Sequence, residues 1–227
     1  MSEGPGFRAQ GPEGKLPVHG FVLAGGKSSR MGRDKATLPF RGRPMVEIAV
    51  EKLRGFCAQV SICGNRDDLA GYAPVVHEER VDAGPAAGIE AGLKECEQPW
   101  AMFVPVDVPL VPGELLRSWA EEALRQAGRG PLVADHLFEA VAQPVFCMIR
   151  ADRYAFWRKA LESGERRLTT LFRELDGGDG YTWHTDAYEI YGDAEPEATL
   201  AERWFVNVNT PEELRAAEAW ASEHGGC

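Results

Sequence analysis

Several features that would place a protein in a specialised class are missing from this sequence. Among its 227 residues, no run of about 18 apolar residues could form a membrane-spanning helix. Acidic residues outnumber basic ones by 35 to 25, and the net charge of −10 disfavours nucleic acid as the main partner. The five cysteines contain no C-x-x-C pair, which excludes the usual zinc, iron–sulfur and redox motifs. We therefore expect a soluble, cytoplasmic globular protein with reduced thiols, no membrane association and no nucleic-acid partner.

The chain is expected to comprise a short leader and one domain. Residues 1–18 are rich in glycine and proline and contain no continuous apolar segment, so we interpret them as a flexible leader rather than a secretory signal. No break in composition divides the remaining residues. This predicts a single domain over residues 19–227.

Strand-like and helical patterns alternate along that domain. Short apolar runs predict strands, and apolar residues three or four positions apart predict helices. The predicted strands lie at 19–24, 59–63, 74–77 and 100–104, and the predicted helices at 44–56, 86–95 and 114–127. This alternation is typical of right-handed crossovers between parallel strands, so the predicted fold is α/β, a single Rossmann-like doubly wound domain with a mainly parallel sheet.

The pattern becomes less regular after residue 130. Strand-like runs occur at 131–134 and 140–149, and helical patterns occur at 152–163 and 169–175. The chain then closes with a predicted strand at 204–206 and a helix after Thr210. Thr210 and Glu213 have the spacing of a capping box, which predicts where that helix begins.

A glycine-rich loop after the first predicted strand carries the strongest chemical signal. From Leu23 to Lys35 it contains three glycines and four cationic residues. Glycines let backbone N–H groups approach a ligand, and Lys and Arg donate charge-assisted hydrogen bonds to phosphate oxygens. The loop is not a P-loop, because Phe21 stands where the first glycine would be, nor does it match the G-x-G-x-x-G fingerprint. We interpret it as a phosphate site, with a charged surface turn as the alternative.

Asp107 marks a second candidate position. It follows the predicted strand at 100–104, so it would lie at the same carboxyl edge of the sheet as the glycine-rich loop. Mg²⁺ prefers one or two carboxylates together with phosphate oxygens and water. Asp107 is therefore a candidate magnesium ligand, and a helix N-cap before Pro112 is the alternative.

Five segments of the chain together resemble one known family. They are the loop Leu-Ala-Gly-Gly-Lys-Ser-Ser-Arg-Met-Gly with Lys35 after it, the turn at 84–88, Asp107, residues 164–167, and Val-Asn-Val-Asn-Thr-Pro-Glu-Glu-Leu at 206–214. In these segments the chain resembles the molybdenum cofactor guanylyltransferases of the nucleotidyltransferase superfamily. The glycine-rich loop is shared across the superfamily, whereas the motif at 206–214 is more specific.

The resemblance implies a nucleotide site with magnesium as cofactor. The residues that it implies in contact with the nucleotide are Leu23, Ala24, Gly25, Gly26, Lys35, Asn65, Glu78 and Asp107. Within this set Lys35 would meet the phosphates, Asn65 the nucleoside region, and Asp107 the Mg²⁺ ion. Glu78 stands where the family usually has Asp, and Glu79 and Asp82 are alternatives for that contact.

The reaction implied by the resemblance joins GTP to molybdenum-carrying molybdopterin. The terminal phosphate of molybdopterin attacks the α-phosphorus of GTP, giving the guanine dinucleotide form of the cofactor and pyrophosphate. A phosphate monoester is mostly dianionic at neutral pH because its second pKa is about 6, so no general base is required. The predicted catalytic residues are Arg30, Lys35 and Asp107, with Lys27 and Arg33 at the rim of the site.

The acceptor is expected to bind through later parts of the chain. Asn207 and Asn209 carry amides that can both donate to and accept from a pterin edge, and Arg166 is a candidate contact for the acceptor's phosphate. Further expected partners are cofactor-delivery proteins and chaperones of molybdoenzymes.

Other interpretations of the sequence are kept open. One is a different nucleotidyltransferase, using CTP on molybdopterin or an NTP on a sugar phosphate. Gly25 disfavours the CTP branch, which by resemblance has alanine there. Another is a non-catalytic nucleotide-binding module for cofactor delivery, which would give no reason to keep both Lys35 and Asp107.

Overall fold

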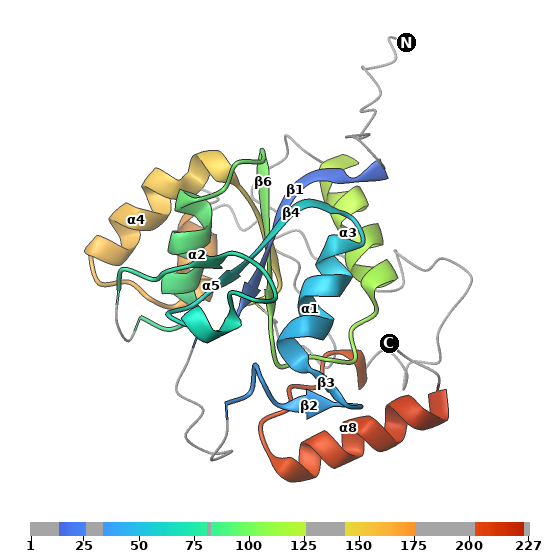
Figure 1. Ribbon diagram of the computed structural model, residues 1–227. Coiled ribbons are helices and arrows are strands. Elements are labelled where there is room, and N and C mark those ends of the chain that lie inside the picture. The colour runs from blue at the N-terminus through green and yellow to red at the C-terminus, as the bar shows by residue number, and fades with distance from the viewer. Residues whose placement is uncertain (1–13, 26–33, 81–82, 126–143, 176–202, 225–227) are drawn as a thin grey trace, which may run out of the picture.

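The computed structural model describes residues 14–25, 34–80, 83–125, 144–175 and 203–224. Its centre is a five-stranded sheet (Figure 1). In spatial order the strands are β5 (Val75–Val76), β4 (Cys57–Cys63), β1 (Leu16–Leu23), β6 (Trp100–Pro105) and β7 (Cys147–Arg150). The first four run parallel, and β7 runs antiparallel to β6. The predicted α/β class and mainly parallel sheet are confirmed.

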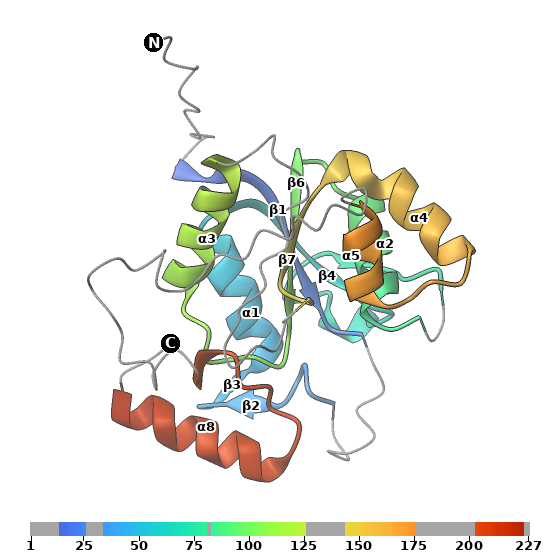
Figure 2. The same ribbon diagram turned by 180° about the vertical axis from the view of Figure 1, so that it is seen from behind.

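Helices cover both faces of the sheet, as Figures 1 and 2 show from opposite sides. One face is covered by α2 (Pro85–Lys94), α4 (Tyr154–Glu162) and α5 (Leu168–Leu175), and the other by α1 (Met45–Arg54) and α3 (Gly113–Arg125). Short 3-10 turns, η2 (Asp67–Leu69) and η3 (Ala151–Arg153), join some of these elements. No helix in the part of the chain that the structure describes is long and apolar enough to cross a membrane.

Alternation along the strands divides the buried apolar residues into two layers. Val22 and Val104 belong to the layer under α1 and α3, whereas Phe21 and Phe103 belong to the layer under α2, α4 and α5. The rings of Phe21 and Phe103 stack with their centroids 5.1 Å apart. Successive residues of a strand point to opposite faces, so these nearly continuous apolar strands are what a sheet covered on both sides requires.

Helix α2 packs closely against the sheet because it carries small residues on its inner side. A Cβ atom on Gly92 would lie 2.5 Å from Cε1 of Phe103, and one on Gly88 would lie 2.8 Å from Cδ2 of Leu23. At the start of the helix Gly84 has φ of +62°, a conformation that glycine adopts without strain, and Pro85 occupies the first turn. The helix therefore begins close to the end of β1.

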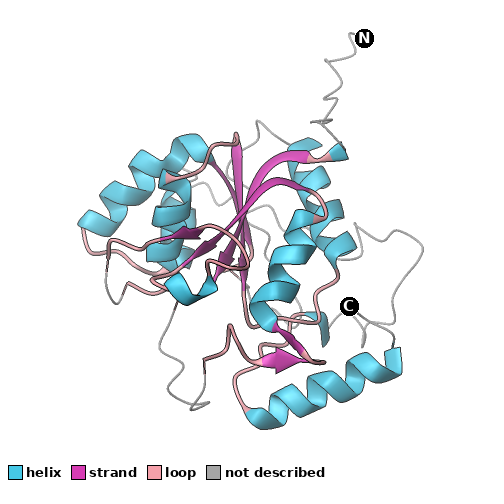
Figure 3. Cartoon of the chain, viewed as in Figure 1, coloured by secondary structure: helices cyan, strands magenta, loops and turns pink. Residues whose placement is uncertain are grey.

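The last helix and a small hairpin lie side by side at the end of the molecule beyond β1 and β6 (Figures 1 and 3). The helix is α8 (Pro211–His224), and the hairpin pairs β2 (Pro39–Phe40) with β3 (Arg43–Pro44). The Arg41 N–H donates to Oε1 of Glu218 at 2.7 Å, which joins the two. The predicted capping box is confirmed, because Glu213 N donates to Oγ1 of Thr210 at 3.2 Å and Thr210 N donates to Oε2 of Glu213 at 2.9 Å.

Two local predictions are corrected by the structure. Strand β1 begins at Leu16, so the boundary between leader and domain lies before residue 18. Residues 204–206 form no strand: the Val206 N–H donates to the Arg203 carbonyl at 3.3 Å, closing a turn. Phe205 is instead buried against the edge of the Phe146 ring, with centroids 5.3 Å apart, so packing rather than sheet pairing explains its apolar character. The strand predicted at 131–134 lies outside the described residues.

Candidate active site

Three loops meet where the strand order of the sheet reverses. β1 pairs with β4 on one side and with β6 on the other, so the loops after these strands share one edge. The Ala24 N–H donates to the Cys63 carbonyl at 2.9 Å, and the Val106 N–H donates to the Leu23 carbonyl at 3.2 Å. Ligands of open α/β sheets bind at such a switch point, outside the carboxyl ends of the strands. The fold thus brings the loops that carry Gly25, Asn65 and Asp107 to one place.

A lysine, a carboxylate and an amide form the centre of this edge. Nζ of Lys35 donates to Oδ2 of Asp107 at 2.8 Å and to Oδ1 of Asn209 at 2.5 Å. The side chains of Lys35 and Asp107 are 21% and 19% exposed, so the pair is partly shielded but open to a ligand. Two oxygen atoms therefore converge on one cationic group.

The segment before α8 is held against this cluster by its backbone. The Val208 N–H donates to the Asp107 carbonyl at 2.8 Å, and Val208 is fully buried. The Asn209 N–H donates to Oε2 of Glu213 at 2.6 Å. The capping box that begins α8 therefore also fixes the position of Asn209.

Asn65 and Glu78 form a reciprocal pair on the β4 side of the same sheet edge. The Asn65 side chain donates to the Glu78 carbonyl at 3.3 Å and accepts from the Glu78 N–H at 3.0 Å. Asn65 thus fixes the backbone of Glu78. The Glu78 side chain lies beside Gly25 and Gly88. A Cβ atom on Gly25 would be 2.6 Å from Oε1 of Glu78, and a Cβ atom on Gly88 would be 3.2 Å from the same oxygen. Burial raises the pKa of the Glu78 carboxyl.

The residues before the glycine-rich loop take part mainly through their backbone. Leu23 and Ala24 are buried, and their side chains belong to opposite layers of the core. The Leu23 carbonyl and the Ala24 N–H are used within the sheet, so the exposed Gly25 is the first residue of the loop whose surface faces outward. Gly26 and Arg30, together with Lys27, Arg33 and Asp82, lie outside the described residues.

The predicted acceptor residues are spread over two places. Arg166 is exposed between α4 and α5, and within the described residues no contact joins it to Lys35, Asp107 or Asn209. Asn207 and Asn209 do not alternate along a strand as expected, because their segment has no strand geometry. Asn209 Nδ2 donates to the Asn207 carbonyl at 3.4 Å, and among described residues the buried Oδ1 of Asn207 has no donor. The structure thus joins Asn209, but not Arg166, to the Lys35 cluster.

Sequence reasoning missed one polar group at this edge. Arg66, just after Asn65, is paired with Asp34, the residue before Lys35, at 2.6 Å. Nothing in the local sequence distinguishes Arg66 from an ordinary charged loop residue. Only its position one residue after Asn65, at the end of a predicted strand, could have suggested a role.

In the part of the chain that the structure describes, neither the buried histidine nor the thiols form a competing catalytic site. His19 Nε2 lies 3.0 Å from the Ser61 hydroxyl, but both residues are buried, and among described residues Nδ1 of His19 has no partner that could orient the ring. Burial raises the pKa of the Cys57, Cys63 and Cys147 thiols and raises the pKa of Cys96 to about 11. These thiols are therefore poor nucleophiles at neutral pH.

Comparison with known proteins identifies the chain as a nucleotidyltransferase. A family model described as "MobA-like NTP transferase domain" matches residues 20–178, and the chain belongs to that family. Within it, the chain is 35% identical over 210 residues to the molybdenum cofactor guanylyltransferase of Polynucleobacter asymbioticus, covering 89% of this chain and 96% of that protein. It is 32% identical to the protein of the same name from Vibrio atlanticus, over 85% of this chain and 91% of that one. The chain is thus a member of the molybdenum cofactor guanylyltransferase family.

Solved structures agree on the fold. The molybdopterin-guanine dinucleotide biosynthesis protein A of Archaeoglobus fulgidus superposes with a TM-score of 0.71 at 22% identity, covering 90% of this chain and 99% of that chain. The 4-diphosphocytidyl-2C-methyl-D-erythritol synthase of Anaerococcus prevotii gives a TM-score of 0.62 at 14% identity, over 92% and 97% of the two chains. The fold alone therefore does not identify the substrate, since these two proteins are named for different products.

Proposed function

We propose that this chain transfers GMP from GTP to the terminal phosphate of molybdenum-molybdopterin. An oxygen of the acceptor phosphate forms a bond to the α-phosphorus of GTP, the bond from that phosphorus to the β-phosphate oxygen breaks, and pyrophosphate leaves. Family membership supports the choice of substrates. The observation that carries the proposal is the convergence of Asp107 and Asn209 on the ammonium group of Lys35 at the carboxyl edge of the sheet.

Magnesium fits this donor set. The Lys35 ammonium shows that the Asp107 carboxylate and the Asn209 amide oxygen can both face one cation. Among the described residues no three His, Cys, Asp or Glu side chains gather as a metal site, and Mg²⁺ needs no such group when phosphates and water complete its shell. We assign Asp107 and Asn209 as the protein ligands. Bound Mg²⁺ would supply positive charge to the departing pyrophosphate.

The protein's own contribution is alignment and charge. Lys35 would bind phosphate oxygens and neutralise charge that grows during transfer, and its position beside Asp107 supports this role. The acceptor phosphate needs no general base, since its second pKa is about 6. Holding two anionic reactants in line is then the main task, and an edge where three loops meet suits it.

Guanine recognition is assigned to Glu78. Its carboxylate lies beside the backbone of Gly25 and Gly88, which supports a contact with the nucleotide base. A carboxylate accepts hydrogen bonds only, which suits the adjacent N–H groups of guanine. Cytosine offers a single amine donor, so this contact favours GTP over CTP. The alternative, a CTP-using or sugar-phosphate enzyme, has no such supporting contact.

Two further parts of the proposal concern the cellular compartment and the partner proteins. We infer that the protein works in the cytoplasm, where it receives molybdopterin from delivery proteins and passes the product to chaperones of molybdoenzymes. The family relationship supports this placement.

The test is an assay of pyrophosphate release with Mg²⁺ and molybdenum-molybdopterin, run in parallel with GTP, CTP, ATP and UTP. We expect release with GTP only, together with a product whose mass equals acceptor plus GMP. Pyrophosphate release with CTP instead of GTP would indicate the CTP-using alternative. Nucleotide binding without release would indicate a delivery module.

A further inference from the structure

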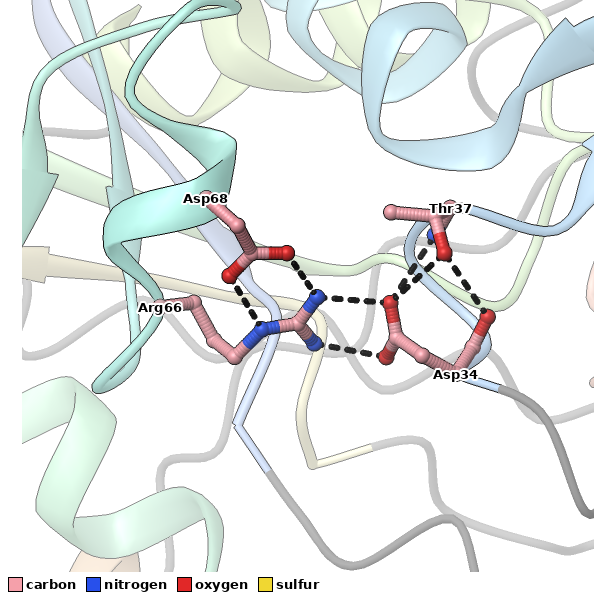
Figure 4. A network of polar contacts seen from close by, with 4 residues as sticks. All are labelled: Asp34, Thr37, Arg66 and Asp68. Atoms are coloured by element: carbon pink, nitrogen blue, oxygen red, sulfur yellow. Dashed lines mark hydrogen bonds and ion pairs between the residues drawn. The ribbon is translucent and has the colours of Figure 1, made fainter.

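A second polar network lies beside the proposed phosphate site. It joins Arg66, in the loop after β4, to Asp34, the residue before Lys35 (Figure 4). Nη1 and Nη2 of Arg66 donate to the two carboxylate oxygens of Asp34 at 2.6 and 2.7 Å. The same guanidinium donates to Asp68 from Nε at 2.8 Å and from Nη2 at 2.6 Å. The guanidinium thus makes two hydrogen bonds to each of two carboxylates. This requires its planar set of N–H donors, which a lysine ammonium lacks.

Asp34 in turn fixes the backbone turn that carries Lys35. Its Oδ2 atom accepts the Thr37 N–H at 3.1 Å and the Thr37 hydroxyl at 3.0 Å, as Figure 4 shows. The Leu38 N–H donates to the Lys35 carbonyl at 3.1 Å, which closes the turn. The position of the Asp34 carboxylate therefore sets the conformation of the turn.

Two adjacent residues thus attach one turn to both sides of the switch point. Asp34 ties it to the loop after β4 through Arg66, and Lys35 ties it to the loop after β6 through Asp107. Because β4 and β6 pair with opposite edges of β1, the turn spans the carboxyl end of that strand.

Charge argues against Arg66 as a phosphate ligand in its own right. One guanidinium faces two carboxylates, so the group of three carries a net negative charge and would not attract a triphosphate. Burial by itself would raise the pKa of Asp34, but hydrogen bonds from Arg66 and Thr37 outweigh burial and lower it. Both partners are therefore charged at neutral pH, and the guanidinium is already engaged.

We propose that Arg66 is a positioning residue for nucleotidyl transfer: through Asp34 it holds the turn that presents Lys35 to the phosphates. This inference rests on the nucleotide role proposed above for Lys35. Removing Arg66 would release the turn from the β4 side and leave the Asp34 carboxylate without its counter-ion near the phosphates. A displacement of about 1 Å at a catalytic group can cost on the order of a hundredfold in rate, so even a partial displacement is measurable.

The experiment compares Arg66→Gln and Arg66→Lys with the unaltered full chain. Turnover is measured against GTP and against the acceptor, and Mg·GTP binding is measured by calorimetry. We expect kcat/KM for GTP to fall by about tenfold or more in both variants, with the acceptor KM within about twofold. In a Lys35→Ala background, Arg66→Gln should cause no further loss of GTP affinity, because it acts through Lys35. A merely structural role would not give this dependence on Lys35.

A matched control is available in the hairpin that precedes the first helix. Arg43 also bonds two carboxylates, donating to Glu47 at 2.9 Å and to Glu51 at 2.5 Å, but all three are on the surface of the hairpin and α1. Arg43→Lys should leave kcat/KM within about twofold, since exposed pairs contribute little.

The outcomes separate the two proposals. If the unaltered protein binds no Mg·GTP, the proposed function fails, and the positioning role fails with it. If it binds and turns over GTP but folded Arg66→Gln and Arg66→Lys match it, only the positioning role is overturned. The positioning role would likewise be overturned if Arg66→Gln lowered GTP affinity as much in the Lys35→Ala background as it does alone. Should Arg66→Gln not fold, Arg66→Lys, which keeps the charge, decides the matter.

Discussion

Nζ of Lys35 lies 2.8 Å from Oδ2 of Asp107, although 72 residues separate them in the sequence. The contact exists because the turn that carries Lys35 lies near the end of strand β6, which pairs with β1. It places the proposed phosphate-binding cation and the proposed metal-binding carboxylate in one partly shielded position.

The first prediction concerns that carboxylate. Asp107→Asn keeps the size of the side chain and an oxygen acceptor for Lys35, but it removes the negative charge that we propose to hold Mg²⁺. We expect turnover to fall by on the order of a hundredfold or more, since metal-held charge stabilisation contributes several kcal/mol to such reactions. Steady-state assays at saturating Mg²⁺ measure it, with thermal unfolding as the check on folding. Turnover close to normal would remove Asp107 from the site.

The second prediction concerns base choice at Gly25. A methyl group there would lie 2.6 Å from Oε1 of Glu78, so Gly25→Ala must displace that carboxylate. If Glu78 reads guanine, the preference for GTP over CTP falls, and the expected size is about 1–3 kcal/mol of discrimination. Competition between the two nucleotides in one reaction measures this ratio directly. An unchanged ratio would mean that guanine is recognised by another group.

Local sequence patterns were sufficient for the core of the fold but not for the contacts between distant segments. The apolar runs of β1 and β6 identify buried parallel strands without any knowledge of their neighbours. The direction of β7 is not encoded in this way, because a short strand of three apolar residues and Arg150 has a similar pattern in either orientation. The same limit applies to the site. Asn209 reaches Lys35 across 174 residues because the Val208 N–H, bonded to the Asp107 carbonyl, holds this segment against the loop after β6, and a motif cannot show that.

The third prediction follows from this contact of Asn209. The sequence suggested that Asn209 binds the acceptor, whereas its oxygen lies 2.5 Å from Nζ of Lys35, which favours the metal and nucleotide side. Asn209→Ala should therefore raise the Mg²⁺ concentration needed for half-maximal activity several-fold, as expected for the loss of one ligand or hydrogen bond of roughly 1 kcal/mol. Mg²⁺ titrations at saturating GTP test this. Asn207→Ala is the comparison and should raise the acceptor KM instead. A raised acceptor KM with an unchanged Mg²⁺ requirement in Asn209→Ala would restore the acceptor role.

The fourth prediction concerns the cost of keeping Glu78 beside the two glycines. Burial raises the pKa of this carboxyl in the folded protein, so the folded state favours the protonated form more than the unfolded chain does. Its contribution to stability is therefore fully present below the unfolded pKa, about 4.3 for Glu, and is lost as pH rises through the higher folded value. Glu78→Gln removes this ionisation. The variant should unfold at a higher denaturant concentration than the unaltered protein at pH 7, and the difference should shrink as the pH is lowered towards 4. The same variant should lose part of its preference for GTP, because the amide offers guanine a single acceptor oxygen where the carboxylate offers two. If Glu78→Gln were less stable than the unaltered protein at pH 7, the Glu78 carboxylate would stabilise the folded state through its contacts, and the prediction would be wrong.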